Sequence, residues 1–353
     1  MTRYANRFAA TAFSVAVAVG LLTACSSNKP FLPSSSPAVI NEMPQWSNLA
    51  TLVPPQLRPL PGTIPLPLRF DVDSNTSSAT GIYASEVYGI DIWGYPINNS
   101  HNGKAICTVT PVSGLNGIAV DGNGDLIDPD GGTSAIIVFK GPQMCGPELG
   151  SVKDPFGQPS DAASANAATG TIVVANIFDN NRKPGSVSRC TLAGGCKANL
   201  KNPNMYEVAG VALATNGDCW ASANNSSGKA TLTYFKGCSG PGKKTTGYRN
   251  AYYGGLDIDG SGNLVSLSYM DKKLYVYKGC NPACARVGGP FVLKGQATFG
   301  HLNASSTQFA TGDFQYGQID VYKYAPTKVK FAYSFNNGLN ASALVEGIAY
   351  DPR

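Results

Sequence analysis

Several short segments carry the residue types of known ligand-binding loops. Residues 121–125 read Asp-Gly-Asn-Gly-Asp, so oxygen-bearing side chains alternate as they do at the start of a calcium loop. An EF-hand loop also needs Gly at its sixth position and a carboxylate at its twelfth, where this chain has Leu126 and Gly132. A similar pattern returns at residues 259–263. Because Asp, Asn and Gly suit tight turns, we interpret both segments as turns between strands.

Residues 237–243 have the glycine spacing of a phosphate-binding loop. However, Lys244 stands where that loop needs Ser or Thr, and no helical pattern follows, so we predict a turn before the last strand of a sheet. Cations and tyrosines that could bind an anion or stack on a sugar gather here, namely Lys243, Lys244, Arg249, Tyr248, Tyr252 and Tyr253. Exposed loops of this composition also occur without a ligand, and we favour that interpretation.

The chain has nine cysteines. One of them, Cys25, belongs to the N-terminal signal described below, and the remaining even number in an exported chain is typical of disulfides. A zinc site is disfavoured because the chain has no Cys-x-x-Cys pair and only two His. The positions in the repeat described below predict the bridges Cys190–Cys196, Cys280–Cys284, Cys219–Cys238 and, by elimination, Cys107–Cys145.

The composition indicates which elements must position these residues. The 353 residues are 43% hydrophobic and only 14% charged, which argues against a coiled coil or a charge-rich disordered chain. No stretch shows a sustained helical period of apolar residues. The formal net charge is +5, and removal of a leader containing Arg3 and Arg7 would leave +3, which does not indicate a nucleic-acid partner.

A unit of short apolar segments and Gly/Asn/Asp turns recurs beyond residue 80. Its anchors at 117, 161, 210, 255, 300 and 347 are spaced 44, 49, 45, 45 and 47 residues apart, a mean of 46. A period in the forties with about four short strands per unit is typical of a β-propeller. The third segment of several units ends in aromatic-Lys-Gly, as at Lys140, Lys236 and Lys278.

The last unit supplies only a first strand, around residues 347–351. Its missing second, third and fourth strands are predicted at 81–87, 89–95 and 105–109, so both ends of the chain would complete one blade. We therefore predict an all-β, six-bladed β-propeller over residues 80–353, closed by N- and C-terminal strands in one shared blade. A seventh unit using residues 70–73 remains an alternative.

The repeated phrase Gly-hydrophobic-Ala-Val-Asp-x-x-Gly-Asn/Asp-Leu resembles that of NHL-type and related six-bladed propellers. The resemblance extends over residues 80–353 and implies an architecture, not an activity. Gluconolactonase-like propellers hold a divalent ion with a Glu, an Asn and an Asp placed just before the first strands. The equivalent positions here are Asn116, Ser160, Ala209, Gly254, Phe299 and Glu346.

Glu346 and Asn116 resemble two of these ligands. The third departs from the pattern, and only Asp161 or Asp257 lies nearby in sequence. Two ligands rarely suffice for a catalytic cation, so the resemblance implies a polar channel mouth more than a metal centre. His301 could act as a base at the same opening, although a lone His in a strand is more often structural.

The N-terminus resembles that of a bacterial lipoprotein. Arg3 and Arg7 precede an apolar stretch over residues 8–22, which is shorter than a membrane span and typical of an export signal. Leu22-Thr-Ala-Cys25 resembles the lipobox, which implies lipidation of Cys25. Ten of the 24 prolines lie between residues 26 and 70, which predicts a tether.

These features predict a signal peptide over residues 1–24, a Pro-rich tether over 25–79 and a propeller over 80–353. The expected location is the bacterial cell envelope. The resemblance to lipoproteins implies that the anchor lies in the outer membrane. We expect a monomeric binding scaffold for an envelope protein, a peptide or a glycan, with no cofactor. The alternative is a metal-dependent, lactonase-like hydrolase that uses Glu346, Asn116 and one Asp.

Overall fold

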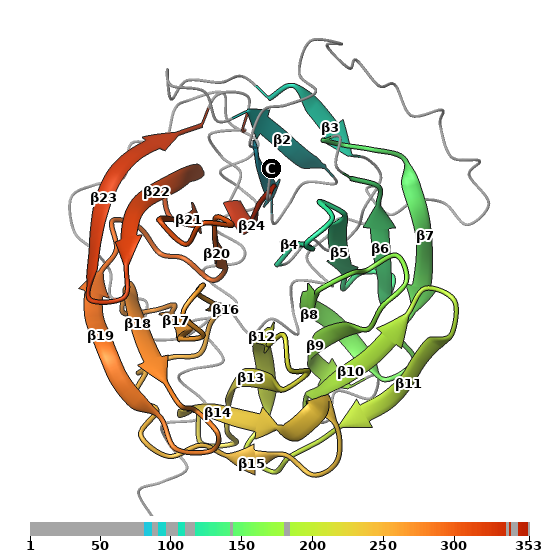
Figure 1. Ribbon diagram of the computed structural model, residues 1–353, viewed down its shortest axis with the longest axis vertical. Coiled ribbons are helices and arrows are strands. Elements are labelled where there is room, and N and C mark those ends of the chain that lie inside the picture. Colours follow the sequence, from blue (N-terminus) through green and yellow to red (C-terminus); the bar gives the residue numbers. More distant parts are fainter. Residues whose placement is uncertain are drawn as a thin grey trace, which may run out of the picture. The chain divides into compact units, whose positions relative to one another are not determined.

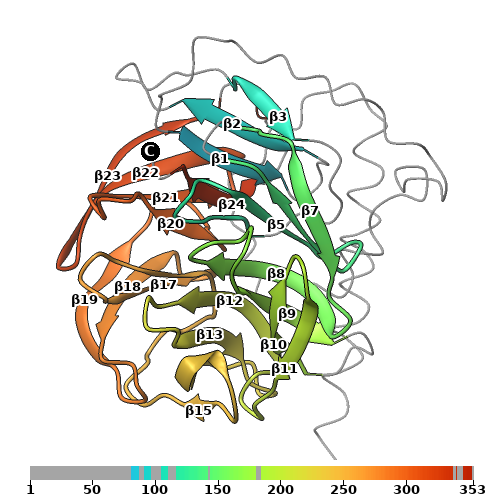
Figure 2. The same ribbon diagram turned by 45° about the vertical axis from the view of Figure 1, so that its right-hand side comes forward.

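The computed structural model describes residues 81–86, 91–96, 105–109, 117–141, 144–179, 184–336, 339 and 345–351. The predicted signal peptide, Cys25, the tether and Asn116 lie outside these residues, as does the segment 70–73. The described residues form six four-stranded antiparallel sheets, which confirms the predicted six-bladed propeller. The sheets follow one another around a common centre (Figure 1), and neighbouring sheets stack face to face (Figure 2).

The blades are numbered here in chain order. Blade 1 contains β24 (Val345–Tyr350), β1 (Gly81–Glu86), β2 (Ile92–Pro96) and β3 (Cys107–Val109). Blade 2 contains β4 (Ala119–Val120), β5 (Leu126–Asp130), β6 (Ala135–Phe139) and β7 (Glu148–Lys153). Blade 3 contains β8 (Gly157–Ser164), β9 (Ile172–Asp179), β10 (Ser186–Thr191) and β11 (Gly195–Leu200).

The other three blades repeat this order from the centre outward. Blade 4 contains β12 (Glu207–Leu213), β13 (Cys219–Asn224), β14 (Ala230–Phe235), the short 3-10 helix η3 (Lys236–Cys238) and β15 (Lys243–Lys244). Blade 5 contains β16 (Leu256–Ile258), β17 (Leu264–Ser268), β18 (Lys273–Lys278) and β19 (Ala285–Val292). Blade 6 contains β20 (Gly300–Leu302), β21 (Gln308–Asp313), β22 (Gln318–Ala325) and β23 (Lys328–Phe335). Within the described part of the chain, no helix is long and apolar enough to cross a membrane.

The two ends of the propeller meet in blade 1. Strand β24 pairs antiparallel with β1, and Ile82 lies opposite Tyr350 while Ala84 lies opposite Ile348. The hydroxyl of Ser85 also accepts a hydrogen bond of 3.0 Å from the Gly347 N–H. This pairing closes the ring and removes two sheet edges that would otherwise be exposed.

The Asp-rich segments of the repeat are turns, as predicted. The Oδ1 atom of Asp121 accepts hydrogen bonds from the N–H groups of Asn123 and Asp125, at 2.8 and 3.0 Å. In blade 5, Asp259 does the same for Ser261 and Asn263, at 3.0 and 2.9 Å. These carboxylates satisfy main-chain donors at the sharpest part of the turn, which accounts for their recurrence.

The four predicted disulfides are present. Three of them connect residues within one blade, namely Cys190–Cys196, Cys219–Cys238 and Cys280–Cys284. The fourth, Cys107–Cys145, connects β3 of blade 1 to the turn after β6 of blade 2. It therefore fastens the blade that contains both chain ends to its neighbour.

Removal of the Cys107–Cys145 bridge should cost more stability than removal of the Cys280–Cys284 bridge. The two bridges close loops with sequence separations of 38 and 4. Chain-entropy estimates give about 4 and about 2 kcal/mol for loops of these lengths. Urea unfolding of the two double Cys→Ala variants measures the free energies of unfolding, and equal losses would contradict this account.

Candidate functional site

The central axis of the propeller contains one acidic residue where its repeats have glycine. Five innermost strands have Gly at the anchor position, namely Gly117, Gly210, Gly255, Gly300 and Gly347. The sixth, β8, has Asp161, which is fully buried. A Cβ atom on Gly117 would lie 2.7 Å from Asp161 Oδ1 and 2.8 Å from the Phe299 ring, so only glycine leaves room for both side chains.

Asp161 is only partly satisfied by hydrogen bonds. Its Oδ2 atom accepts a 3.0 Å hydrogen bond from the Val211 N–H in the next blade, whereas Oδ1 has no partner. Burial raises the pKa of Asp161 to about 7, although the charge of His301 and main-chain N–H groups oppose this rise. The carboxyl group therefore changes its protonation state near neutral pH.

His301 and Asp257 form a pair beside Asp161. The Nδ1 atom of His301 lies 3.4 Å from Asp257 Oδ2, and the two side chains are 16% and 23% exposed. Burial alone would lower the pKa of His301, but Asp257, the charge of Asp161 and a hydrogen bond to the main chain of Ile118 together raise it. We call Asp161, Asp257 and His301 the axial cluster.

The other polar contacts of the axial cluster are with main chain. Asp257 Oδ2 accepts a 2.7 Å hydrogen bond from the Leu302 N–H, and Oδ1 accepts one of 2.7 Å from Ile258. His301 extends from blade 6 and interacts with residues of blades 2, 3 and 5. The cluster can therefore connect blades across the axis and exchange protons near neutral pH.

A groove of about 450 Å³ reaches the axial cluster from one end of the propeller. The turns between the first and second strands of blades 4, 5 and 6 form its walls. Its polar and aromatic lining includes Thr215, Trp220, Asp257, Asp259, Asn303 and Ser306. Asp257 is the member of the cluster that lines this groove.

The residues predicted at the channel mouth are not all brought together. Asp257 and His301 are paired, whereas Glu346 is fully buried and neither of its carboxyl oxygens has a hydrogen-bond partner. Burial raises the pKa of Glu346 well above its usual value. Asn116 lies outside the described residues.

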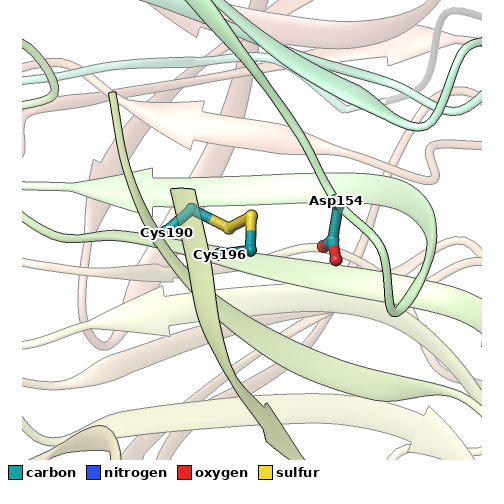
Figure 3. Close-up of side chains that lie close together, drawn as sticks. All are labelled: Asp154, Cys190 and Cys196. Carbon is teal, nitrogen blue, oxygen red and sulfur yellow. A yellow bond between two sulfur atoms is a disulfide. The ribbon is translucent and has the colours of Figure 1, made fainter. Parts of the chain in front are cut away.

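A geometric group resembling a metal site occurs elsewhere. Among the described residues, Asp154, Cys190 and Cys196 alone form a set of three or more ligand atoms that all lie within 4.8 Å of one another. Figure 3 shows that the two sulfur atoms are bonded to each other, and their distance is 2.02 Å. Disulfide sulfur does not offer the thiolate that metals bind, so these residues form a structural bridge beside a carboxylate.

The sequence indicated Asp257 and His301 but did not single out Asp161. In the sequence, Asp161 stands out only by its proximity to the third ligand position, at which this chain differs from the gluconolactonase-like pattern. The signal that identifies it is its alignment with five glycines, since a carboxylate in the place of glycine must lie where blades approach most closely. Asp128, a fully buried residue of β5 whose carboxyl oxygens have no partner, carries no such signal, since its equivalents in blades 4 and 5 are Ala221 and Ser266.

Comparisons with known proteins bear on the fold alone. No family model matches the chain, and no curated protein matches it. A chain in the crystal structure of a nidogen/laminin complex is similar at a TM-score of 0.59 and 13% identity, covering 77% of this chain and 98% of that one. A streptogramin B lyase structure matches at a TM-score of 0.47 and 12% identity, covering 71% and 73%. The fold and the axial cluster thus define this protein as a six-bladed β-propeller.

Proposed function

We propose that this chain is a lipid-anchored envelope protein whose propeller binds another molecule through its outer surface. The observation that carries this proposal is the occupied axis. At the axis, Phe299 and Asp161 both lie against Gly117. Asp257 bonds with His301 and with main-chain N–H groups. A partner can then reach the outer strands and turns, and the groove that Asp257 lines.

Lipid anchoring rests on the sequence before residue 26. Mass spectrometry of the N-terminal peptide of the chain purified from membranes tests it directly. We expect the mature chain to begin at a Cys25 that carries acyl chains, and Cys25→Ser to abolish acylation. An N-terminus at another residue, or an unmodified Cys25, would refute the lipid anchor. It would not bear on whether the propeller binds a partner.

A metal-dependent hydrolase is the second candidate, and the orphaned carboxyl group of Glu346 favours it. A buried carboxyl with two unpartnered oxygens is the kind of group that a cation can satisfy. Among the described residues, Glu346 belongs to no set of three or more His, Cys, Asp or Glu residues whose ligand atoms lie within 4.8 Å of one another. A cation held by Glu346 would act as a Lewis acid on a bound ester or lactone.

Cation titration distinguishes the two candidates. If the propeller is a binding scaffold, 1 mM calcium or zinc should leave its melting temperature unchanged in both the wild type and Glu346→Gln. If Glu346 holds a catalytic cation, the wild type should gain melting temperature by linkage and Glu346→Gln should not. Asp271→Asn provides a control for nonspecific cation binding, because Asp271 lies away from the axis in the turn before β18.

A further inference from the structure

Acidic and basic residues are segregated between the interior and the surface of the propeller. The described residues include 18 Lys and Arg, of which 15 are exposed. They also include 19 Asp and Glu, of which 14 are buried and only Glu148 is exposed. The totals of basic and acidic residues are nearly equal, but most acidic residues are buried and most basic ones are exposed. The surface is therefore cationic although the net charge is small.

Several of the buried carboxylates accept hydrogen bonds from donors within the fold. Asp121 and Asp259 accept main-chain hydrogen bonds within turns, and Asp218 accepts them from Gly237 N–H and Tyr234 O–H. Asp218 lies beside one exposed cation, since it bonds with the residue after Lys236 and the charge of Lys236 helps to lower its pKa. Of these 15 cations, only Lys201 and Lys294 lie within 4.0 Å of a carboxylate oxygen of a described residue.

Two stretches of the chain that contribute to this surface contain no acidic residue. Residues 219–256 and 272–312 contain no Asp or Glu. Six exposed cations lie in the turns after β14 and β18, in the strands that flank these turns, and in the loop after β15. We call them the basic ridge: Lys236, Lys243, Lys244, Arg249, Lys278 and Arg286. Blades 4 and 5, which carry these turns, are neighbours in the ring (Figure 1).

The two halves of the basic ridge are held together. The Thr246 N–H donates to the Pro282 carbonyl at 2.9 Å, and the Cys284 N–H donates to the Thr246 carbonyl at 2.7 Å. The disulfides Cys219–Cys238 and Cys280–Cys284 fix the turn on either side. Because the turns are fixed before any ligand arrives, less entropy is lost when an anion binds across them.

Two of the three nearby tyrosines, Tyr248 and Tyr253, have their rings packed within the protein, whereas Tyr252 is half-buried. Tyr248 packs on Tyr277 with ring centroids 5.4 Å apart, and its hydroxyl lies 2.9 Å from Ser266 Oγ. Tyr253 is only 3% exposed. Stacking of nucleic-acid bases or sugars needs free aromatic faces, so these contacts favour a ligand recognised by its charge.

The ridge also lacks the large apolar side chains that insert into a bilayer. Among the described residues, the exposed large hydrophobic side chains are Leu149, Tyr206, Val292, Tyr316 and Phe331, and none belongs to the ridge. A surface of this kind contacts anionic headgroups without penetrating the hydrocarbon. Each Lys or Arg near such a surface contributes about 1 kcal/mol to the binding free energy. A tether to the same bilayer would raise the effective concentration of the lipid at the ridge.

We propose that the basic ridge binds the anionic phospholipid headgroups of the membrane that holds the anchor. This inference rests on the proposed lipid anchoring, because the anchor would keep the ridge at a high effective concentration near the bilayer. It also names the partner of the outer surface. Three of the ridge cations, Lys243, Lys244 and Arg249, are those that the sequence already placed in a segment able to bind an anion.

Lysine labelling of the full chain on vesicles tests the proposal. The protein is mixed with phosphatidylcholine vesicles or with vesicles containing 30% phosphatidylglycerol, and flotation and lysine acetylation are measured by mass spectrometry. We expect Lys236, Lys243, Lys244 and Lys278 to be acetylated at least fivefold more slowly on the anionic vesicles, and this protection to disappear in 0.5 M NaCl. Lys153 and Lys330 should be labelled equally on both.

A charge-matched pair of variants supplies the control. The ridge variant changes Lys236, Lys243, Lys244 and Lys278 to Gln, and the control variant changes Lys140, Lys153, Lys197 and Lys330 to Gln. The ridge variant should lose a salt-sensitive part of its affinity for anionic vesicles, about tenfold or more, while the control variant should keep it. Equal losses would assign binding to net charge and overturn the ridge.

The outcomes separate the ridge from the anchor. Flotation on both vesicle types without lysine protection keeps the anchor and overturns the ridge. Flotation on anionic vesicles alone supports the ridge and overturns the anchor, and flotation on neither overturns both. Protection by single-stranded DNA but not by anionic vesicles would assign the ridge to another polyanion and overturn the lipid partner.

Discussion

Deletion of residues 345–353 should abolish the cooperative unfolding transition of the propeller. Strand β24 contributes the buried side chains of Val345, Ile348 and Tyr350 and a full set of strand pairings to β1. Burial of these three side chains alone is worth roughly 5–8 kcal/mol, which is comparable with the total stability of many domains. The deletion also exposes the edge of β1. We expect loss of the near-ultraviolet circular dichroism signal and aggregation on heating.

A pair of point variants separates ring closure from general damage. Ile348 and Ile118 are both fully buried and occupy equivalent positions, each directly after an anchor glycine on the innermost side of its blade. Ile348→Ala and Ile118→Ala should each lose about 2–5 kcal/mol of unfolding free energy. If Ile348→Ala costs nothing while Ile118→Ala does, the C-terminal strand does not stabilise the ring. A synthetic peptide of residues 345–353 should restore the signal of the deletion variant.

The closed ring was predictable because each level of the sequence indicates the same structure. The period of the repeat, the turn residues and the incomplete last unit all required a strand near residue 347 to pair near residue 81. The disulfides followed from the same register. Cys107 and Cys145 could be paired only by elimination, since nothing in a single repeat says which outer strand lies beside the next blade.

The site was less predictable because its residues come from different blades and meet only at the central axis. In sequence, Asp161 and His301 are separated by more than half of the length of the propeller. The repeat shows which positions are equivalent, but it does not show which side chain extends across the axis. The sequence shows part of the cationic surface, namely Lys243, Lys244 and Arg249, but the net charge does not show its extent. Net charge counts each carboxylate equally, although a turn-capping Asp218 and an exposed Glu148 have opposite effects on what a partner meets.

Asp161→Asn should stabilise the propeller increasingly as the pH rises. Asp161 has a folded pKa of about 7 against an unperturbed 3.8, so folding favours its protonated form. Its contribution to stability is full below pH 3.8 and is lost as the pH rises to about 7. A difference of this size amounts to about 4 kcal/mol. Asn keeps an oxygen for the Val211 N–H and does not ionise.

The measurement is the free energy of unfolding of both proteins between pH 4.5 and 8.5. The difference between Asp161→Asn and the wild type should move in favour of Asn by a few kcal/mol across this range. His301 changes in the same direction in the wild type, because its pKa is also raised and its contribution is lost as the pH rises through that value. Part of the His301 contribution disappears in the variant, since the charge of Asp161 helps to hold the imidazolium.

Asp218→Asn provides the control of opposite sign. Desolvation works to raise the pKa of Asp218, but hydrogen bonds from Gly237, Tyr234 and Asn216 outweigh it and lower the pKa. Its contribution is therefore present above the unfolded pKa and is lost as the pH falls, so Asp218→Asn should do most harm at neutral pH. If the stability difference for Asp161→Asn does not change with pH, the axial carboxyl is ionised throughout. The cluster would then hold a permanent charge at the centre of the ring.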